Sequence, residues 1–168
     1  MEIALIAAKS KNNVIGKNNK LLWNLPDDLE FFMGKTKGHF LLMGRRTFES
    51  LEDDLAGRKV IVVTKIKNYH PSFNCLIFDN LPDGINEARI RNETELLICG
   101  GDSVYRQTIA FADKMYLTEI DQEFSGDAFF PEFDRTLWNI SLIKEFRKDE
   151  LHPIAFEISE FRRKLIHV

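Results

Sequence analysis

Short apolar segments that alternate with helical patterns constrain the fold of this chain more than any other feature. Each segment is bounded by turn residues and has the length of a strand that is buried on both faces of a sheet. The segments occupy residues 3–8, 39–44, 59–64, 75–78, 95–100 and 114–120. Helical patterns follow several of them, at residues 26–36, 45–51, 81–90 and 102–112. This strand-then-helix order predicts an α/β fold with a mainly parallel sheet.

The last part of the chain has a different pattern. Residues 138–146 and 154–161 alternate apolar and polar side chains, with no helical pattern between them. They predict an antiparallel hairpin that closes one edge of the sheet. No repeat, low-complexity tract or linker interrupts the chain, so we expect a single domain over residues 1–168.

Composition excludes several classes of protein. With 44% hydrophobic residues, 29% charged residues and a net charge of -3, the chain is typical of a soluble globular protein and offers no support for a nucleic-acid partner. The N-terminus turns polar after eight residues, too soon for a signal peptide or a membrane span, so we expect a cytoplasmic protein. Cys75 and Cys99 are expected to be free thiols, and the scattered histidines predict no metal site.

Asp28 lies on the apolar stripe of the helix predicted over residues 26–36. If Leu25 defines 0° around the helix axis and each residue adds about 100°, Phe32 lies at about 340°, Asp28 at about 300° and Asp27 at about 200°. A surface carboxylate favoured by the helix dipole suits Asp27, whereas a half-buried carboxylate must find donors or become protonated. A planar ligand with paired N–H groups would supply those donors. Spacing alone leaves a structural role for Asp28 open beside a functional one.

Two glycine turns join strands to helices, one within residues 43–48 and one within residues 98–105. Gly44, Gly100 and Gly101 allow a close approach of the backbone, and the helix starts that follow favour anions. Each turn alone is common turn chemistry. Together they predict a dinucleotide across the strand ends, although the chain lacks the GxGxxG of an ordinary Rossmann fold.

Basic residues surround the first of these turns. Arg45, Arg46 and Thr47 begin the predicted helix, and Thr64 and Lys65 end the third long strand. Together they could hold an additional phosphate, which favours NADPH over NADH.

An ordered set of segments carries a family resemblance over nearly the whole chain. The segments are VIG (14–16), WNLPDDL (23–29), MGRRTFES (43–50), GRKVIVVT (57–64), ICGGDSVY (98–105), YLTEID (116–121) and GDAFFP (126–131). This set resembles the bacterial dihydrofolate reductases. The resemblance implies an eight-stranded, mainly parallel sheet with four helices, and NADPH-dependent reduction of 7,8-dihydrofolate to tetrahydrofolate. It also implies that antifolate inhibitors bind, and a single small domain makes a monomer the expected state.

The resemblance assigns roles to individual residues. Asp28 matches the acid that bonds the pteridine amino group and ring N–H, Thr118 matches the threonine that braces this acid, and Arg58 resembles the arginine that binds the glutamate carboxylate of folate. Pocket walls match Ile6, Ala7, Leu29, Phe32, Leu51, Leu55 and Cys99. Cofactor positions match Ala8, Ile15, Gly16, Leu21, Gly44, Arg45, Arg46, Thr47, Thr64, Lys65, Gly100, Gly101, Asp102, Ser103, Val104 and Tyr105.

The family also suggests how the site works. The loop over residues 16–22 closes over the nicotinamide, steadied by Gly126 and Asp127, and a cis peptide joins the paired glycines. No matched side chain reaches N5 of the pterin, so we expect water to deliver the proton while Asp28 orients and polarises the ring.

Three residues depart from the family pattern, and two other functions stay open. Leu22 stands where proline is common, Cys99 where an aliphatic residue is common, and Asp102 adds a charge that either caps a helix or weakens cofactor binding. A pyrimidine reductase of riboflavin synthesis would not need Asp28 or Arg58. A folate- or nucleotide-binding protein without turnover would be expected to lack the acid or the loop glycine.

Overall fold

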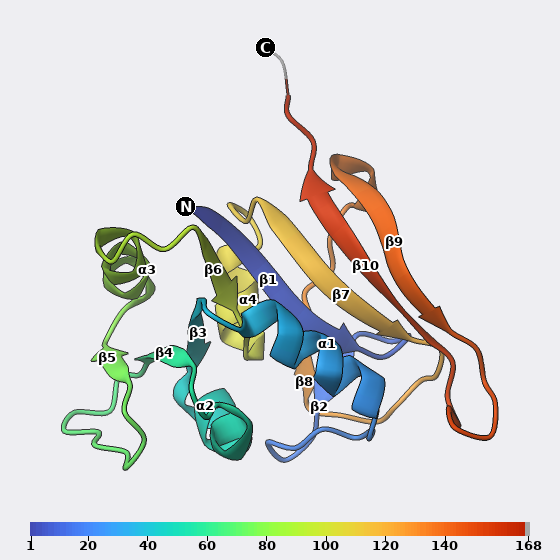
Figure 1. Cartoon of the computed structure of the whole chain (residues 1–168), viewed down its shortest axis with the longest axis horizontal. Coiled ribbons are helices and arrows are strands. Elements are labelled where there is room, and N and C mark those ends of the chain that lie inside the picture. Colours follow the sequence, from blue (N-terminus) through green and yellow to red (C-terminus); the bar gives the residue numbers. More distant parts are fainter. Residues whose placement is uncertain (167–168) are drawn as a thin grey trace.

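An eight-stranded sheet forms the centre of the molecule in the computed structural model, which describes residues 1–166 (Figure 1). The strand order is β5-β4-β3-β6-β1-β7-β10-β9. The strands are β1 (Glu2–Lys9), β3 (Phe40–Gly44), β4 (Lys59–Val63), β5 (Leu76–Phe78), β6 (Glu95–Ile98), β7 (Lys114–Ile120), β9 (Trp138–Phe146) and β10 (Phe156–Arg163). These strands match the segments expected from the sequence.

Strand directions confirm the predicted mainly parallel sheet. β1 runs parallel to β6 and β7, β3 runs parallel to β4 and β6, and β4 runs parallel to β5. β10 is antiparallel to both β7 and β9, so the predicted hairpin closes one edge. Because β1, β3, β4 and β6 are parallel, their carboxyl ends meet at one side of the sheet, where open α/β sheets bind ligands.

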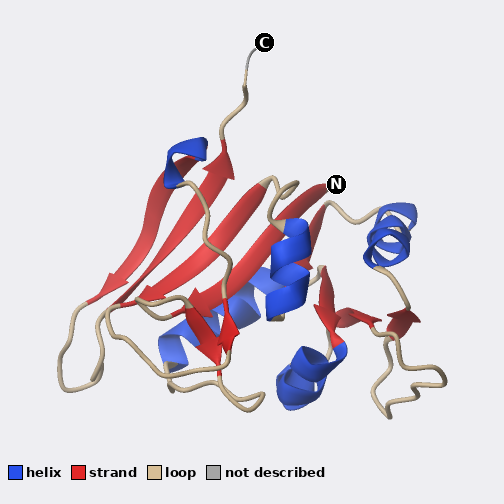
Figure 2. Cartoon of the chain, turned by 180° about the vertical axis from the view of Figure 1, so that it is seen from behind, coloured by secondary structure: helices blue, strands red, loops and turns tan. Residues whose placement is uncertain are grey.

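The helices cover both faces of the sheet. Figure 1 shows α1 in front of the central strands, and Figure 2, from behind, shows α4 on the opposite side. The α-helices are α1 (Pro26–Thr36), α2 (Arg45–Leu51), α3 (Leu81–Ile90) and α4 (Asp102–Thr108), and the short 3-10 turns are Glu52–Asp54 and Arg135–Leu137. The bounds of α1, α2 and α3 agree with the sequence patterns.

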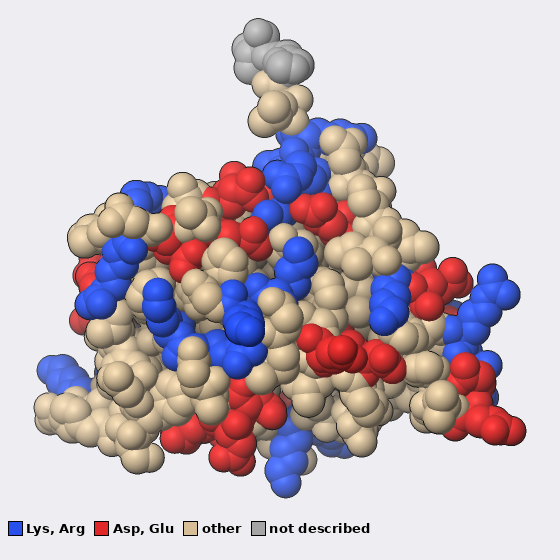
Figure 3. Space-filling model, in the orientation of Figure 1, with Lys and Arg blue, Asp and Glu red and all other residues tan. Residues whose placement is uncertain are grey.

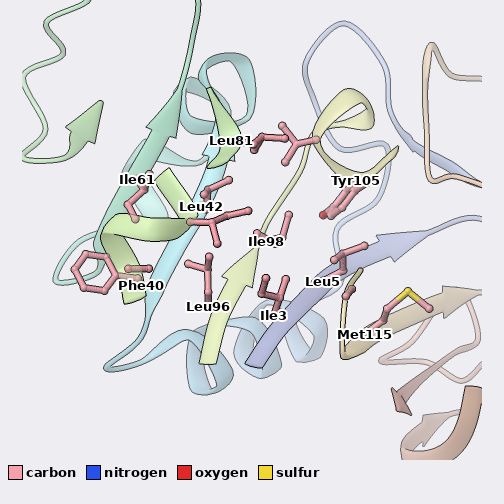
Figure 4. Close-up of a cluster of buried hydrophobic side chains, with 14 of the residues drawn as sticks. Ile3, Leu5, Phe40, Leu42, Ile61, Leu81, Leu96, Ile98, Tyr105 and Met115 are labelled. Atoms are coloured by element: carbon pink, nitrogen blue, oxygen red, sulfur yellow. The ribbon is translucent and has the colours of Figure 1, made fainter. Parts of the chain in front are cut away.

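Alternating strand residues divide the core between the two faces. Ile3 and Leu5 pack with side chains of α3 and α4, a cluster shown in Figure 4. Ala4 and Ile6 pack on the other face, with Phe48 of α2. This period of two follows from the pleat of a strand that is covered on both sides.

Helix α4 ends at Thr108, before the predicted limit of residue 112. Arg163 of β10 explains the difference. Its guanidinium donates to the carbonyl oxygens of Ile109 at 2.6 Å and of Ala112 at 2.7 Å. These bonds satisfy backbone groups just beyond the helix, so the chain turns there toward β7 instead of continuing the helix.

A second, two-stranded sheet was not expected from the sequence. It pairs β2 (Val14–Gly16) with β8 (Ala128–Phe129) in antiparallel fashion. Gly126 precedes β8 and lies close to β2. A Cβ at Gly126 would clash with the side chain of Val14 and lie 2.6 Å from the carbonyl oxygen of Gly16. Only glycine permits this approach.

Charges of both signs are interspersed on the face drawn in Figure 3. This distribution agrees with the small net charge of -3. No helix within residues 1–166 is both long enough and apolar enough to cross a bilayer.

Candidate active site

A cavity of about 1130 Å³ lies at the carboxyl ends of β1, β3, β4 and β6. Side chains of α1 line one wall, and the starts of α2 and α4 line another. A pocket for one small ligand has a volume of roughly 300–1,000 Å³. The cavity is therefore large enough for two ligands side by side.

Asp28 lines the cavity from the first turn of α1. Pro26 suits this helix start because it has no N–H to leave unbonded, and the carbonyl oxygen of Leu25 accepts the N–H of Asp28 at 3.0 Å. The hydroxyl of Thr118 on β7 donates to Oδ1 of Asp28. Burial raises the pKa of Asp28, and the bond from Thr118 partly opposes this rise. A buried acid with a raised pKa is typical of a functional site.

Asp27 faces away from the cavity, as helical phase predicted. Its Oδ2 lies 2.8 Å from Nε2 of His152, in the loop between β9 and β10. Nδ1 of the same imidazole lies 3.0 Å from Oδ1 of Asp149. These two carboxylates raise the pKa of His152. Adjacent acids thus have separate environments, because about 100° of helix separates them.

Apolar side chains form the walls around Asp28. Ile6 and Ala7 come from β1, and Cys99 follows β6. Burial raises the pKa of the Cys99 thiol well above its usual value, so this thiol is packed and unreactive at neutral pH. The remaining predicted wall residues that line the cavity are Leu29, Phe32 and Leu51.

Trp23 lines the same wall and was not selected from the sequence. Its indole Nε1 is buried and has no hydrogen-bond partner within residues 1–166. Its ring packs against Phe124 with centroids 5.3 Å apart. A buried, unpaired donor on a residue that lines a cavity suits a polar atom of a ligand or a bound water. The signal available in the sequence was its place in WNLPDDL, beside the acid. Other lining residues not selected include Asn24, Phe31 and Ser50.

The two glycine turns touch each other at the cavity. The N–H of Gly44 donates to the carbonyl oxygen of Gly100 at 2.9 Å, and a cis peptide joins Gly100 to Gly101. A Cβ at Gly101 would lie 3.0 Å from Oγ1 of Thr47, so a larger residue would fill the space between the turns. Gly44 and Gly101 are the N-cap residues of α2 and α4, and no side chain caps either helix. These helix starts therefore present backbone N–H groups that fit the phosphates of a dinucleotide.

Asp102 does not cap α4, contrary to one of the two readings of the sequence. Its carboxylate pairs with Arg106 one turn later. Its Oδ2 also accepts the N–H of Phe129 in β8, at 3.1 Å. The side chain therefore joins α4 to β8.

Arg45 is held by its own helix. Its Nη1 lies 3.0 Å from both carboxylate oxygens of Glu49, and the hydroxyl of Tyr69 lies 3.2 Å from Oε1 of Glu49. Burial and the neighbouring Glu49 raise the pKa of Tyr69 to about 12. The arginine is thereby positioned at the cavity beside Arg46 and Thr64, which also line it.

The loop over residues 16–22 covers the cavity and is held at two points. Asn18 and Asn19 have φ of 49° and 60°, the positive values of a two-residue hairpin turn. Nδ2 of Asn19 donates to the carbonyl oxygen of Arg46 at 2.8 Å. On the other side, the N–H of Asn18 donates to Oδ2 of Asp127 at 3.0 Å, and the N–H of Asp127 donates to the carbonyl oxygen of Gly16 at 3.1 Å.

Most predicted site residues lie together around this cavity, but four do not line it. Leu55 is fully buried beneath the wall, and Gly100 lies behind Tyr105. Arg58 donates from Nη2 to the carbonyl oxygen of Met33 at 2.7 Å, beside the end of α1. Lys65 is exposed beyond the end of β4. The predicted cofactor positions that do line the cavity are Ala8, Ile15, Gly16, Leu21, Gly44, Arg45, Arg46, Thr47, Thr64, Gly101, Asp102, Ser103, Val104 and Tyr105.

A cleft across the carboxyl ends of a mainly parallel sheet, with glycine turns at one end and a buried carboxylate at the other, defines an α/β protein that holds a dinucleotide against a second ligand. The family model described as dihydrofolate reductase matches residues 2–163, and the chain belongs to this family.

Curated relatives and a solved structure agree with this membership. The chain is 37% identical to the dihydrofolate reductase of Bacillus subtilis (strain 168), covering 96% of this chain and 95% of the relative. It is 32% identical to that of Staphylococcus haemolyticus, covering 97% and 96%. Dihydrofolate reductase from Enterococcus faecalis, solved in complex with NADP(H) and RAB-propyl, superposes with a TM-score of 0.87 at 34% identity, covering 96% of each chain.

Proposed function

We propose that the protein reduces 7,8-dihydrofolate to 5,6,7,8-tetrahydrofolate with NADPH, and so supplies the reduced folate used in one-carbon metabolism. The observation that carries this proposal is the carboxylate of Asp28, buried in an apolar wall, bonded to Thr118 and facing a cavity that has room for two ligands. Family membership supports the same reaction.

NADPH supplies the hydride when it is bound. Asp28 binds the amino group and ring N–H of the pterin, and its charge polarises the ring toward acceptance of the hydride. Ile6, Phe32 and Leu51 exclude bulk water around the reacting rings. We propose that water admitted at the edge of the site delivers the proton to N5, while Asp28 orients the ring. The unpaired Nε1 of Trp23 is suited to hold such a water or a pterin oxygen.

The two glycine turns and the basic residues beside them are proposed to hold the cofactor. Backbone N–H groups at the starts of α2 and α4 would bind the pyrophosphate. Arg45, with Arg46 and Thr64, would bind the 2′-phosphate that distinguishes NADPH from NADH. Arg58, which lies beside the end of α1 and outside the cavity lining, would bind the glutamate carboxylate of the substrate.

The surroundings in which the protein works are also proposals. A single domain with charges of both signs on its surface supports a monomer. We also propose a cytoplasmic location, as expected from the sequence. We further propose that antifolate inhibitors occupy the pterin end of the cavity and compete with dihydrofolate.

The direct test is oxidation of NADPH and of NADH by the purified protein, measured side by side with dihydrofolate. We expect turnover with both, and a clear preference for NADPH. A correctly folded protein that shows no dihydrofolate-dependent oxidation of either cofactor would overturn the proposal.

A further inference from the structure

We propose that Asp102 is a positioning residue that ties the start of α4 to β8 and, through β8, holds the loop over residues 16–22 closed. This inference rests on the proposed function, because it concerns how the cofactor end of the cleft communicates with the loop that covers it. Within the site, Asp102 stood out as an added charge beside the glycine turn, and its contacts give that charge a use.

Asp102 contacts one residue of its own helix and one residue of β8. Arg106 pairs with its carboxylate, and the Asp102 side chain is 25% exposed whereas that of Arg106 is 60% exposed. Oδ2 accepts the N–H of Phe129 at 3.1 Å. The carboxylate is therefore partly neutralised by Arg106 on its own helix and bonded to the backbone of β8, so it links two elements through residues that are 27 apart in sequence.

β8 is held in part by the buried Phe130 that follows it, which packs against Tyr105 of α4 with ring centroids 5.1 Å apart, and in part by the contacts of its own two residues. It consists of Ala128 and Phe129, paired with Gly16 and Val14 of β2. Isolated two-stranded sheets are marginally stable in water, so contacts from outside decide where this one lies. The bond from Phe129 to Asp102 is such a contact.

The loop depends on the residue just before β8. Oδ2 of Asp127 accepts the N–H of Asn18 at 3.0 Å, and the N–H of Asp127 donates to the carbonyl oxygen of Gly16 at 3.1 Å. A continuous path of hydrogen bonds and paired backbone thus runs from α4 through β8 to the loop. Release of Phe129 from Asp102 would lower the fraction of molecules in which the loop is closed.

A lower fraction of closed molecules would weaken the binding of the cofactor. For a ligand that binds only the closed state, the apparent dissociation constant equals the intrinsic dissociation constant divided by the fraction of closed molecules. If the charge of Asp102 acted only by repelling the pyrophosphate, its removal would instead strengthen binding. The two explanations therefore predict opposite signs for a variant that removes both the charge and the acceptor.

The test compares Asp102→Ala, which loses the charge and the acceptor, with Asp102→Asn, which loses the charge but keeps an oxygen for Phe129. Glu87→Ala is the matched control, because it breaks an ion pair of the same spacing on α3, with Arg91. Two quantities are measured: amide hydrogen exchange at Asn18 and Asp127 without cofactor, and the dissociation constant for NADPH.

We expect Asp102→Ala to speed exchange at Asn18 and Asp127 by roughly three- to tenfold, as for loss of one hydrogen bond. Binding of NADPH should weaken by a smaller factor, because exchange follows the open fraction whereas the dissociation constant follows the reciprocal of the closed fraction. Asp102→Asn should recover most of both changes, and Glu87→Ala should match the wild type. Unchanged exchange in Asp102→Ala, or tighter NADPH in both Asp102 variants, would overturn the proposal. Equal acceleration in the central strands β1 and β6 would also overturn it, since that result marks general unfolding.

The exchange measurement separates this inference from the proposed function. It uses neither substrate nor turnover. If the wild type failed to oxidise NADPH with dihydrofolate while Asp102→Ala still released the loop, the proposed function would fail and the positioning role would stand.

Discussion

Thr118 on β7 donates a hydrogen bond from its hydroxyl to Oδ1 of Asp28 on α1, across 90 residues of sequence. This bond fixes the carboxylate against the sheet. No side chain within residues 1–166 bonds to Oδ2, which leaves that oxygen for the cavity that Asp28 lines. A neutral hydroxyl supports the acid without cancelling its charge, so the charge is kept for a ligand. Burial without a partner cation is also why the pKa of this carboxyl rises.

Asp28→Asn should unfold at higher denaturant concentration than the wild type at pH 7. Because the pKa of Asp28 in the folded protein lies above its ordinary value of 3.8, the folded state binds this proton more tightly than the unfolded chain does. The wild type therefore loses stability as the pH rises from 3.8 through the raised pKa. The asparagine has no charge to bury, so the difference in free energy of unfolding should grow over this range. Urea titrations at several pH values measure it, and a constant difference would contradict this explanation.

Asn19→Gly should weaken the binding of NADPH several-fold, whereas Asn18→Gly should leave this binding unchanged. Both residues have positive φ, which glycine adopts freely, so both variants keep the turn. Asn19 bonds to the carbonyl oxygen of Arg46 through its side chain, whereas Asn18 bonds to Asp127 through its backbone. Only the first variant loses the bond across the cleft. Fluorescence titration with NADPH measures the effect, and equal weakening by both variants would show that turn flexibility matters instead.

Arg45→Ala should weaken the binding of NADPH by roughly 10- to 100-fold, as expected for loss of hydrogen bonds to a charged group. The binding of NADH should weaken by less than about twofold. Arg91→Ala is a suitable control, since Arg91 pairs with Glu87 on α3 as Arg45 pairs with Glu49 on α2. Dissociation constants for both cofactors check this prediction. Similar losses for NADPH and NADH would remove Arg45 from the 2′-phosphate.

Two helical glycines should respond to alanine in opposite directions. At Gly34 in α1, a Cβ would meet nothing within 4 Å, so Gly34→Ala should stabilise by roughly 0.5–1 kcal/mol through helix propensity. At Gly84 in α3, a Cβ would lie 3.1 Å from Ile61 and 3.2 Å from Leu42, both fully buried. Overpacking there costs about 1–3 kcal/mol and should outweigh the propensity gain. Chemical denaturation measures both, and a stabilised Gly84→Ala would mean that α3 moves away from the sheet at little cost.

Local patterns predicted most of the fold. Apolar periodicity and Pro26 placed α1, and helical phase alone put Asp28, and not Asp27, on the apolar stripe. These features depend on residues that are close in sequence, so sequence patterns can predict them. The role of Arg163 in ending α4 could not be predicted from the sequence, because a strand more than 50 residues away supplies the bonds.

Three features of the site lay beyond sequence patterns for a physical reason. β2 and β8 have three and two residues, too few to show alternation. The bond from Asp102 to Phe129 joins parts of the chain that only the folded sheet brings together. Trp23 was visible as a residue, but its unpaired indole N–H is a property of packing.

The steady-state rate of dihydrofolate reduction by Asp28→Asn, compared with Asp27→Asn, tests the central claim most directly. Asp27 bonds to His152 away from the cavity, so its variant serves as the matched control for loss of one carboxylate from the first turn of α1. We predict that Asp28→Asn loses roughly 10²-fold or more of kcat/KM at neutral pH, as for removal of one electrostatic group from an active site, while Asp27→Asn stays within about twofold of the wild type. Equal losses in the two variants, or full activity in Asp28→Asn, would contradict the assignment of Asp28 as the acid that binds the pterin.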